Sequence, residues 1–311
     1  MELVETAAGC RALVDAARAT GRVVGLVPTM GALHPGHLSL MRRARSECEV
    51  VAVSIFVNPL QFGDPGDMAA YPRTLERDLA LCAEAGVDIV FAPPVTEMYP
   101  DWPALVATSV SVSGVSEAWE GASRPGHFDG VATVVAKLFS IAGPGRAYFG
   151  EKDFQQLAVV RRMVADLSLP VEVIGCPTVR EEDGLALSSR NVRLSAEERR
   201  AAVVLSGALA AGRTALAEGV RSPSTLTEVM RRVVAGQPLV TLDYAVAVDA
   251  GTLVEPADAV DVPALRLLVA AQVGPVRLID NCAAGAALPE APAPAAPVAS
   301  RRVVRQLERI G

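Results

Sequence analysis

Short apolar runs alternate with helically spaced stretches through the first 180 residues of the chain. The run at residues 50–57 is almost continuously apolar and rich in β-branched residues, as is typical of a strand buried on both faces of a sheet. Residues 37–47 and 74–85 show helical spacing instead, and Gly86 ends the second helix. The remaining expected strands are residues 23–27, 87–91, 147–149 and 171–174, and the remaining expected helices are residues 131–141 and 154–167. This alternation predicts right-handed βαβ crossovers and an α/β fold with a parallel sheet.

The pattern changes around residue 180. Ser195 has Glu198 at capping-box spacing and opens a long Ala-rich helix to residue 216, followed by a helix at residues 223–234. Three strand-like runs come next, at residues 242–248, 265–271 and 276–279. We therefore predict a first domain at residues 1–180, a smaller α+β lid domain at residues 181–282 hinged near residues 180–190, and a flexible Ala/Pro-rich tail at residues 283–311. Residues 301–310 have the pattern of a short basic amphipathic helix, but a solvated tail is the favoured interpretation.

Composition and charge narrow the function classes. The 311 residues carry a net charge of −6, which argues against a general nucleic-acid binder. The N-terminus has no apolar signal-peptide core, and no apolar run reaches membrane-spanning length. The five cysteines are scattered and form no C-x-x-C pair, which indicates reduced thiols without a zinc site or disulfides: Cys10, Cys48, Cys82, Cys176 and Cys282. We expect a cytoplasmic protein that binds neither nucleic acid nor membranes.

The strongest chemical signal is a loop that holds two of the three histidines. His34 and His37 belong to the run Thr-Met-Gly-Ala-Leu-His-Pro-Gly-His at residues 29–37, between an expected strand and an expected helix. The N–H groups at a helix start lack intrahelical partners and favour phosphate, and two imidazoles add further donors. The loop lacks the lysine of a Walker loop and the glycines of the dinucleotide fingerprint. It predicts chemistry at an α-phosphate; the alternative is a polar helix cap with incidental histidines.

Two amides follow the buried strand at residues 50–57. Asn58 and Gln61 come at the end where ligands of parallel sheets bind. Neutral amides recognise hydroxyls and carboxylates without adding charge. For Asn58 alone an ordinary Asn-Pro turn is the favoured alternative, whereas Gln61 stands between Leu60 and Phe62 and is less easily explained as a turn residue.

A third strand-to-helix loop contains the run Gly-Glu-Lys-Asp at residues 150–153. The glycine leaves free N–H groups for a phosphate or a ribose, and Lys152 is a suitable point charge for phosphate oxygens. Asp153 is equally well explained as a helix cap. Gln156 follows one turn into the helix and is expected to face the same edge.

Two further segments carry weaker signals. Ser188, Ser189 and Arg190 follow the run Thr-Val-Arg at residues 178–180, and small hydroxyls beside an arginine suit a mobile phosphate clamp. A serine-rich turn with a surface arginine is the alternative. His127 lies in a Gly/Pro-rich loop, where a surface position is favoured over a phosphate or carboxylate contact.

Taken together, these segments resemble the pantoate–β-alanine ligase family. The resemblance rests on Pro-Thr-Met-Gly-Ala-Leu-His-Pro-Gly-His at residues 28–37, Val-Ser-Ile-Phe-Val-Asn-Pro-Leu-Gln-Phe at 53–62, Tyr-Pro-Arg-Thr at 71–74, Phe-Gly-Glu-Lys-Asp-Phe-Gln-Gln at 149–156 and Ser-Ser-Arg-Asn at 188–191. The histidine loop is also the signature of the wider nucleotidyl-transferase and class I aminoacyl-tRNA synthetase superfamily. The resemblance implies a Rossmann-like parallel sheet with a smaller C-terminal α+β domain.

The family activity implied is the ATP-dependent condensation of (R)-pantoate with β-alanine through a pantoyl adenylate, which yields pantothenate, AMP and diphosphate for coenzyme A biosynthesis. The resemblance makes His37 the catalytic histidine, with His34 and Lys152 stabilising charge beside it. The implied ATP-binding residues are Met30, Gly31, Ala32, Leu33, His34, Pro35, Gly36, His37, Gly150, Glu151, Lys152, Asp153, Val179, Leu187, Ser188, Ser189 and Arg190.

The resemblance also assigns the small substrates and the metal. It implies that Gln61 and Gln156, with Asn58, hold pantoate, and that Gln61 lies near β-alanine. It implies Mg²⁺ held mostly by ATP with help from Asp78, and a homodimer. Two positions depart from the family pattern, Leu187 for Met and Phe154 for Tyr, and neither removes a charge.

Two rival functions remain open from the sequence. A nucleotidyltransferase that acts on a phosphorylated acceptor shares the histidine loop, but its acceptor favours lysine or arginine over paired glutamines. A nucleotide-binding regulator without turnover is disfavoured by the joint presence of both histidines, Lys152 and both glutamines.

Overall fold

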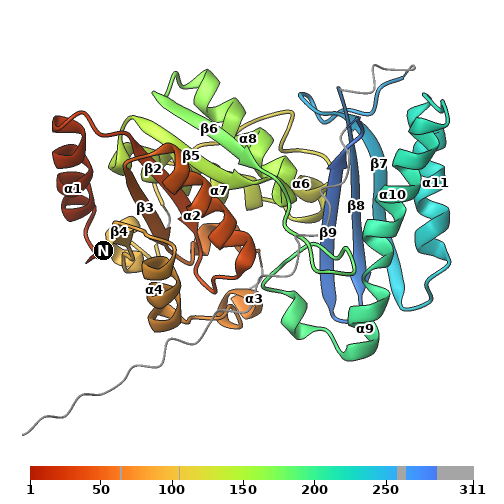
Figure 1. The fold of residues 1–311 in the computed structure, drawn as a ribbon, viewed down its shortest axis with the longest axis horizontal. Helices are drawn as coiled ribbons and strands as arrows, with labels where there is room; N and C mark the ends of the chain where they lie inside the picture. The colour runs from red at the N-terminus through yellow and green to blue at the C-terminus, as the bar shows by residue number, and fades with distance from the viewer. Residues whose placement is uncertain (64, 105, 258–263, 286–311) are drawn as a thin grey trace, which may run out of the picture.

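A six-stranded sheet forms the centre of the larger part of the molecule (Figure 1). The computed structural model describes residues 1–63, 65–104, 106–257 and 264–285. All neighbouring strands of this sheet pair in parallel, in the order β1-β4-β3-β2-β5-β6. The strands are β1 (Glu2–Val4), β2 (Val24–Thr29), β3 (Val50–Ile55), β4 (Ile89–Phe91), β5 (Gly145–Gly150) and β6 (Val171–Cys176). The expected parallel α/β fold is confirmed.

Helices cover both faces of this sheet. Val51 and Val53 of β3 are fully buried on the face covered by α2 (Pro35–Glu47) and α4 (Leu75–Glu84). Val50 and Ala52 belong to the core on the opposite face. That face is covered by α1 (Ala7–Ala19), α7 (His127–Ala142) and α8 (Phe154–Asp166). Short helices lie in the connecting segments: η1 (Pro59–Gln61), α3 (Pro65–Ala69), α5 (Val95–Met98), α6 (Glu120–Ser123) and η2 (Glu151–Asp153). Burial on both faces explains why β3 is almost continuously apolar.

The strand order reverses between β2 and β5. From β2 the chain builds β3 and β4 on one side, and β5 then returns to pair with the other side of β2. Loops beyond the carboxyl ends of strands at such a reversal form the usual ligand crevice of open α/β sheets. The histidine loop follows β2 and the Lys152 loop follows β5, so the topology places both at the crevice.

A second, antiparallel sheet of three strands lies at the other end of the molecule, in the order β7-β8-β9 (Figure 1). Its strands are β7 (Val240–Asp249), β8 (Leu265–Val273) and β9 (Val276–Ala283). Helices α10 (Val204–Ala217) and α11 (Pro223–Ala235) cover one face, and η3 (Asn191–Arg193) and α9 (Ala196–Ala201) precede them. The other face adds Val246, Val248 and Leu268 to the core of the parallel sheet, so the two sheets are joined by apolar contact.

Several element boundaries differ from expectation. The single helix expected from Ser195 to residue 216 is divided into α9 and α10 by a tight turn, in which the Leu205 N–H bonds to the Ala202 carbonyl. The strand β1 and the helix α1 were not predicted. Strand β9 extends to Ala283, four residues beyond the predicted end. Of the predicted tail, residues 286–311 lie outside the described residues.

Candidate active site

Two histidines form the N-terminal cap of α2. The Nδ1 atom of His34 accepts a hydrogen bond from the Gly36 N–H at 3.2 Å, and the Nδ1 atom of His37 accepts from the His34 N–H at 3.3 Å. The two ring centroids lie 4.0 Å apart. A β-carbon at position 36 would lie 2.8 Å from the His34 ring, so a larger residue there would displace the ring. The helix-cap alternative is therefore correct about the geometry, but both rings also line a pocket.

The cap fixes the protonation of both imidazoles. A ring nitrogen that accepts a hydrogen bond carries no proton, so the neutral ring must carry its proton on Nε2. Burial, together with the nearby Lys152, lowers the pKa of His34 to about 4. Burial lowers the pKa of His37 to about 3, with His34 acting in the same direction. Both rings are thus neutral Nε2–H donors at neutral pH.

The loop before the histidines is held by a buried carboxylate. Gly31 (φ 79°) and Ala32 (φ 49°) take left-handed conformations, and the N–H groups of Ala32 and Leu33 each donate to Asp78 at 2.9 Å. The Asp78 carboxylate also accepts from Thr74 Oγ1 at 3.1 Å and is 1% exposed. Both of its oxygens are thus used to shape the loop. Among the described residues, no group of three or more His, Cys, Asp or Glu side chains is arranged to hold a metal ion.

The side chain of Asn58 orients the side chain of Gln61 through a hydrogen bond. The Asn58 amide nitrogen donates to Gln61 Oε1 and to the Gly130 carbonyl, each at 3.0 Å, while its oxygen accepts from the Tyr99 hydroxyl at 2.9 Å. Asn58 is 1% exposed. Its hydrogen-bonding groups are all used inside the protein, so it reaches a ligand only through Gln61. The Gln61 Nε2 atom contacts Met30 Sδ at 3.0 Å and lines the pocket.

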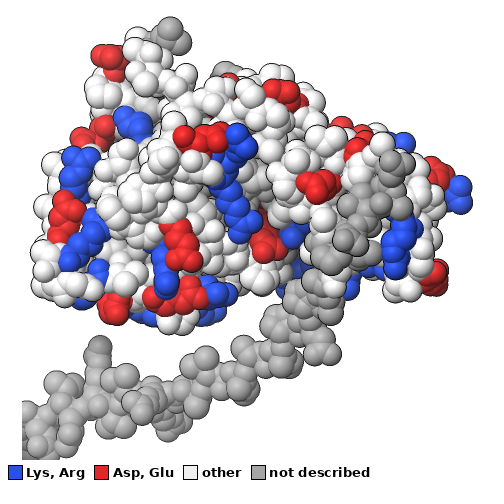
Figure 2. Space-filling model, turned by 90° about the horizontal axis from the view of Figure 1, so that it is seen from above, with Lys and Arg blue, Asp and Glu red and all other residues white. Residues whose placement is uncertain are grey.

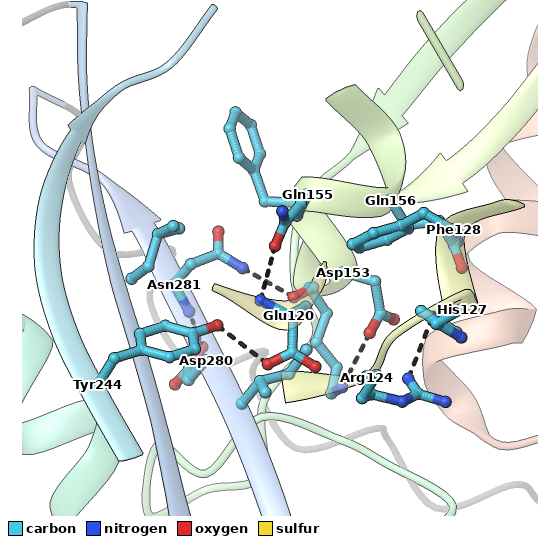
Figure 3. A pocket seen from close by; sticks show the side chains of 14 residues that line it. Glu120, Arg124, His127, Phe128, Asp153, Gln155, Gln156, Tyr244, Asp280 and Asn281 are labelled. Carbon is cyan, nitrogen blue, oxygen red and sulfur yellow. Dashed lines mark hydrogen bonds and ion pairs between the residues drawn. The ribbon is translucent and has the colours of Figure 1, made fainter. Parts of the chain in front are cut away.

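His127 is buried, and the expectation of a surface position was wrong. It opens α7 and is 8% exposed. Its Nδ1 bonds with the Gln61 carbonyl at 2.9 Å, and its Nε2 bonds with Arg124 Nη1 at 3.1 Å. Burial, together with the neighbouring Arg124, lowers the pKa of His127 to about 4. The neutral ring therefore links Gln61 to Arg124, and Figure 3 shows its contact with Arg124.

Lys152 lies on η2, beyond the end of β5. Its Nζ is 3.6 Å from Asp153 Oδ1. Desolvation acts to raise the pKa of Asp153, but Lys152 and Arg190 outweigh this effect and the pKa lies below its usual range. Gln156 lines the same pocket one turn into α8, whereas Gln155 is turned away and donates to the Val115 and Ala118 carbonyls.

A hairpin-like loop forms the opposite wall. It begins at Val179, whose carbonyl accepts from the Leu187 N–H at 2.9 Å. The Ser188 hydroxyl accepts from the Arg190 N–H at 3.2 Å. Arg190 lies 3.7 Å from Asp67 on α3 and is more than one-third exposed. A weakly paired, partly exposed guanidinium is free to turn toward an anion.

One pocket brings most of the predicted site residues together. It is lined by Met30, His34, Gly36, His37, Gln61, Gly150, Lys152, Asp153, Gln156, Val179, Leu187, Ser188, Ser189 and Arg190. Asn58 lines an adjoining cavity instead. The predicted residues outside both cavities are Gly31, Ala32, Leu33, Pro35, Glu151 and the metal candidate Asp78. The pocket also includes Tyr71 and Arg124, for which the sequence patterns predicted no role.

Charge on the outer surface is mixed. On the face shown in Figure 2, lysine and arginine side chains alternate with acidic ones over most of the surface. No helix among the described residues has the length and apolar character needed to cross a membrane.

Comparison with known proteins gives consistent matches. The model of the family described as pantoate-beta-alanine ligase matches residues 2–283. A pantothenate synthetase of Rubrobacter xylanophilus is 56% identical over 270 residues, which are 86% of this chain and 92% of that protein. A pantothenate synthetase of Moorella thermoacetica is 53% identical over 281 residues, 90% of this chain and 98% of that protein.

Solved structures agree with these matches. A crystal structure of pantothenate synthetase from Thermus thermophilus has a TM-score of 0.85 and 52% identity, and covers 91% of this chain and 99% of that one. A pantoate-beta-alanine ligase from Francisella tularensis, solved in complex with beta-gamma ATP and β-alanine, has a TM-score of 0.73 and 33% identity, with 92% and 99% coverage. With its fold, its histidine-capped pocket and these relatives, the chain belongs to the pantoate–β-alanine ligase family.

Proposed function

We propose that this chain condenses (R)-pantoate with β-alanine in two steps, with ATP as the energy source and pantoyl adenylate as the intermediate. One observation carries the proposal: the neutral imidazoles of His34 and His37, one ammonium and two guanidinium groups line a pocket that also contains two glutamine amides. The family membership supports pantoate and β-alanine as the two substrates that are joined, and the Francisella relative was solved with beta-gamma ATP and β-alanine.

In the first step, a carboxylate oxygen of pantoate bonds to the α-phosphorus of ATP. The bond from that phosphorus to the bridging oxygen breaks, and pyrophosphate leaves with the electron pair. Negative charge is spread over the phosphate oxygens in such a reaction, so catalysis depends on positioned donors. We assign the Nε2–H groups of His37 and His34 to the α-phosphate oxygens, and Lys152 and Arg190 to the departing pyrophosphate.

The acid is recognised by amides. Gln61 and Gln156 supply donors and acceptors for the hydroxyl and carboxylate of pantoate. Neither adds a positive charge, which would stabilise the bound carboxylate and make it a weaker nucleophile. Asn58 acts as a positioning residue, because its amide orients Gln61. The nucleotide contacts fall to Met30, Gly36, Gly150, Val179, Leu187, Ser188 and Ser189 around the same pocket.

In the second step, the neutral amine of β-alanine attacks the acyl carbon of the adenylate. The bond from that carbon to the phosphate oxygen breaks, AMP leaves with the electron pair, and the new amide nitrogen gives its proton to solvent. An acyl adenylate is readily hydrolysed, so the pocket must exclude water between the steps. We assign this closure to the loop at residues 187–190, which forms one wall of the pocket.

Magnesium enters this proposal only with ATP. The two oxygens of Asp78 together accept three hydrogen bonds in a buried position, so the carboxylate does not fit the role of a metal ligand. Magnesium usually keeps several waters and binds substrate phosphates. We therefore propose that Mg²⁺ is held by the ATP phosphates, and that Asp78 shapes the residues 30–33 loop.

Two measurements on purified protein test the function. Mass spectrometry of a mixture of ATP, pantoate and β-alanine is expected to show pantothenate and AMP in equal amounts. Exchange of labelled pyrophosphate into ATP is expected only when pantoate is present. Exchange that instead requires a phosphorylated acceptor would establish the nucleotidyltransferase alternative, and tight ATP binding without AMP formation would establish a regulator.

We further propose a division into residues 1–180 and 181–282, a cytoplasmic location and a homodimer. The five cysteines are free and buried, which suits a reducing compartment. The homodimer rests on family resemblance. Light scattering at several concentrations tests it, and a single-chain mass throughout would contradict it.

A further inference from the structure

One strand of the second sheet is bonded to the loop that carries Lys152. The side-chain amide nitrogen of Asn281 on β9 donates to the Lys152 carbonyl at 2.7 Å and to the Glu151 carbonyl at 3.0 Å. These partners are about 130 residues apart in the chain. Asn281 is 4% exposed, and removing its amide would take one hydrogen bond from each of the two carbonyls.

A buried arginine fixes the orientation of that amide. Arg266 on β8 donates from Nε to Asn281 Oδ1 at 2.8 Å, which leaves the amide nitrogen for the two carbonyls. The same guanidinium donates to Glu151 Oε2 at 3.0 Å and stacks over the Phe154 ring at 4.0 Å. The loop is therefore held on both sides of Lys152 by two neighbouring strands.

The residue next to Asn281 holds the opposite wall of the pocket. Asp280 is 3% exposed and accepts two hydrogen bonds from Arg180, at 2.6 and 2.9 Å. Arg180 forms a β-bridge with Ala186, which directly precedes the segment that carries Ser188 and Arg190. Two consecutive residues of β9 thus anchor the two loops that supply Lys152 and Arg190, two of the three cationic side chains of the pocket.

We propose that Asn281 and Asp280 are positioning residues, which set the separation between Lys152 and Arg190 across the nucleotide pocket. The proposal rests on the phosphate role proposed above for Lys152. A rigid backbone anchor matters here because a displacement of about 1 Å at a charged donor costs up to about 10²-fold in rate. The second sheet then contributes directly to adenylation and is not only a cover for the pocket.

A double-mutant cycle tests whether Asn281 acts through Lys152. Asn281→Ala is expected to lower the rate of pantoate-dependent pyrophosphate exchange about 10-fold or more, with the KM for pantoate changed less than about twofold. In a Lys152→Ala background, the added Asn281→Ala change is expected to lower the residual exchange rate less than about twofold. An equal loss in both backgrounds would overturn the proposal.

A matched control distinguishes positioning of Lys152 from a general contribution to the stability of the contact between the two sheets. Trp119→Phe removes one side-chain donor, Nε1 to the Leu253 carbonyl at 2.9 Å, between the same two parts of the molecule but away from η2. We expect it to lower the melting temperature without changing the exchange rate. If Asn281→Ala also changes only the melting temperature, Asn281 is purely structural and the proposal fails.

A second variant covers a failure of Asn281→Ala to fold. Asn281→Asp keeps the size of the side chain but replaces the donor with an acceptor facing two carbonyls, so the same cycle with Lys152→Ala is expected to give the same non-additive result. If Lys152→Ala alone retains full exchange activity, the proposed role of Lys152 is wrong. If Lys152→Ala is impaired and the Asn281 loss is additive, only the positioning proposal is wrong.

Discussion

Each histidine at the start of α2 uses one ring nitrogen in folding and keeps the other for the pocket. The Nδ1 atoms of His34 and His37 accept backbone hydrogen bonds, so each neutral ring presents an Nε2–H donor. Burial keeps the pKa of both rings well below neutrality. Their proposed role is to donate hydrogen bonds without changing protonation during turnover.

Substitutions at His37 separate its two nitrogens. Asparagine places an acceptor near Nδ1 and retains the cap but loses the Nε2–H donor, whereas glutamine places an amide N–H near the Nε2 position. We expect His37→Asn to lower kcat by about 10²-fold, the scale for losing one transition-state donor, and His37→Gln to lower it less. Steady-state kinetics with a melting curve for each variant measures this, and equal losses would mean that the Nε2 donor is not the important group.

Gln61 is expected to act on the acid and not on the nucleotide. Its carbonyl and side chain are held by His127 and Asn58, which leaves its Nε2 side toward the pocket. Gln61→Ala is expected to raise the KM for pantoate about 10-fold or more, since a lost hydrogen bond to a charged group is worth about 1.5–3 kcal/mol, while the KM for ATP stays within about twofold. Equal increases for both substrates in initial-rate measurements would refute this assignment.

At the scale of elements, the cap of α2 depends on close backbone approach. A β-carbon at position 36 would lie 2.8 Å from the His34 ring, which must then move. We expect Gly36→Ala to lower the pyrophosphate exchange rate about 10-fold through the displaced imidazole.

Gly63 provides the matched control for this change. A β-carbon there meets no atom within 4 Å. Gly63→Ala is expected to leave the exchange rate unchanged. If both variants keep the wild-type rate, the position of the His34 ring does not limit adenylation.

At the scale of the whole molecule, the three histidines link stability to pH. Burial lowers the pKa of His34 and His127 to about 4 and of His37 to about 3. In the unfolded chain the histidine pKa values are near 6.5, so between the folded-state pKa values and pH 6.5 the unfolded chain binds more protons than the folded chain. The stabilisation is fully present above pH 6.5 and is lost as the pH falls toward 4.

Urea denaturation at several pH values measures this linkage. For His127 alone the complete effect is on the order of 3 kcal/mol. His127→Gln is therefore expected to show a shallower fall in the free energy of unfolding between pH 6.5 and 4 than the wild-type chain. Parallel curves for the two proteins would show that His127 is not buried as a neutral ring.

Local sequence patterns were sufficient for five of the six strands of the parallel sheet and for the loops of the pocket. Apolar periodicity and glycine-containing turns depend on neighbouring residues, so the strands near residues 23–27 and 50–57 were found with small errors in their ends. The same logic placed the histidine loop and Lys152 after strands of one sheet. The burial of β3 on both faces was predictable from the sequence because every position in the strand is apolar or small.

The tertiary structure alone decided which polar groups are used for support and which face the pocket. Asn58, Asp78 and His127 each have a nearby partner, but their other hydrogen-bond partners lie 41 to 72 residues away, and a local sequence pattern gives no information on such contacts. Asn281 lies beyond the predicted end of its strand and reaches Lys152 only through the packing of the second sheet against the first. Local patterning fixes elements because its forces act over a few residues; long-range hydrogen bonds depend on how those elements pack.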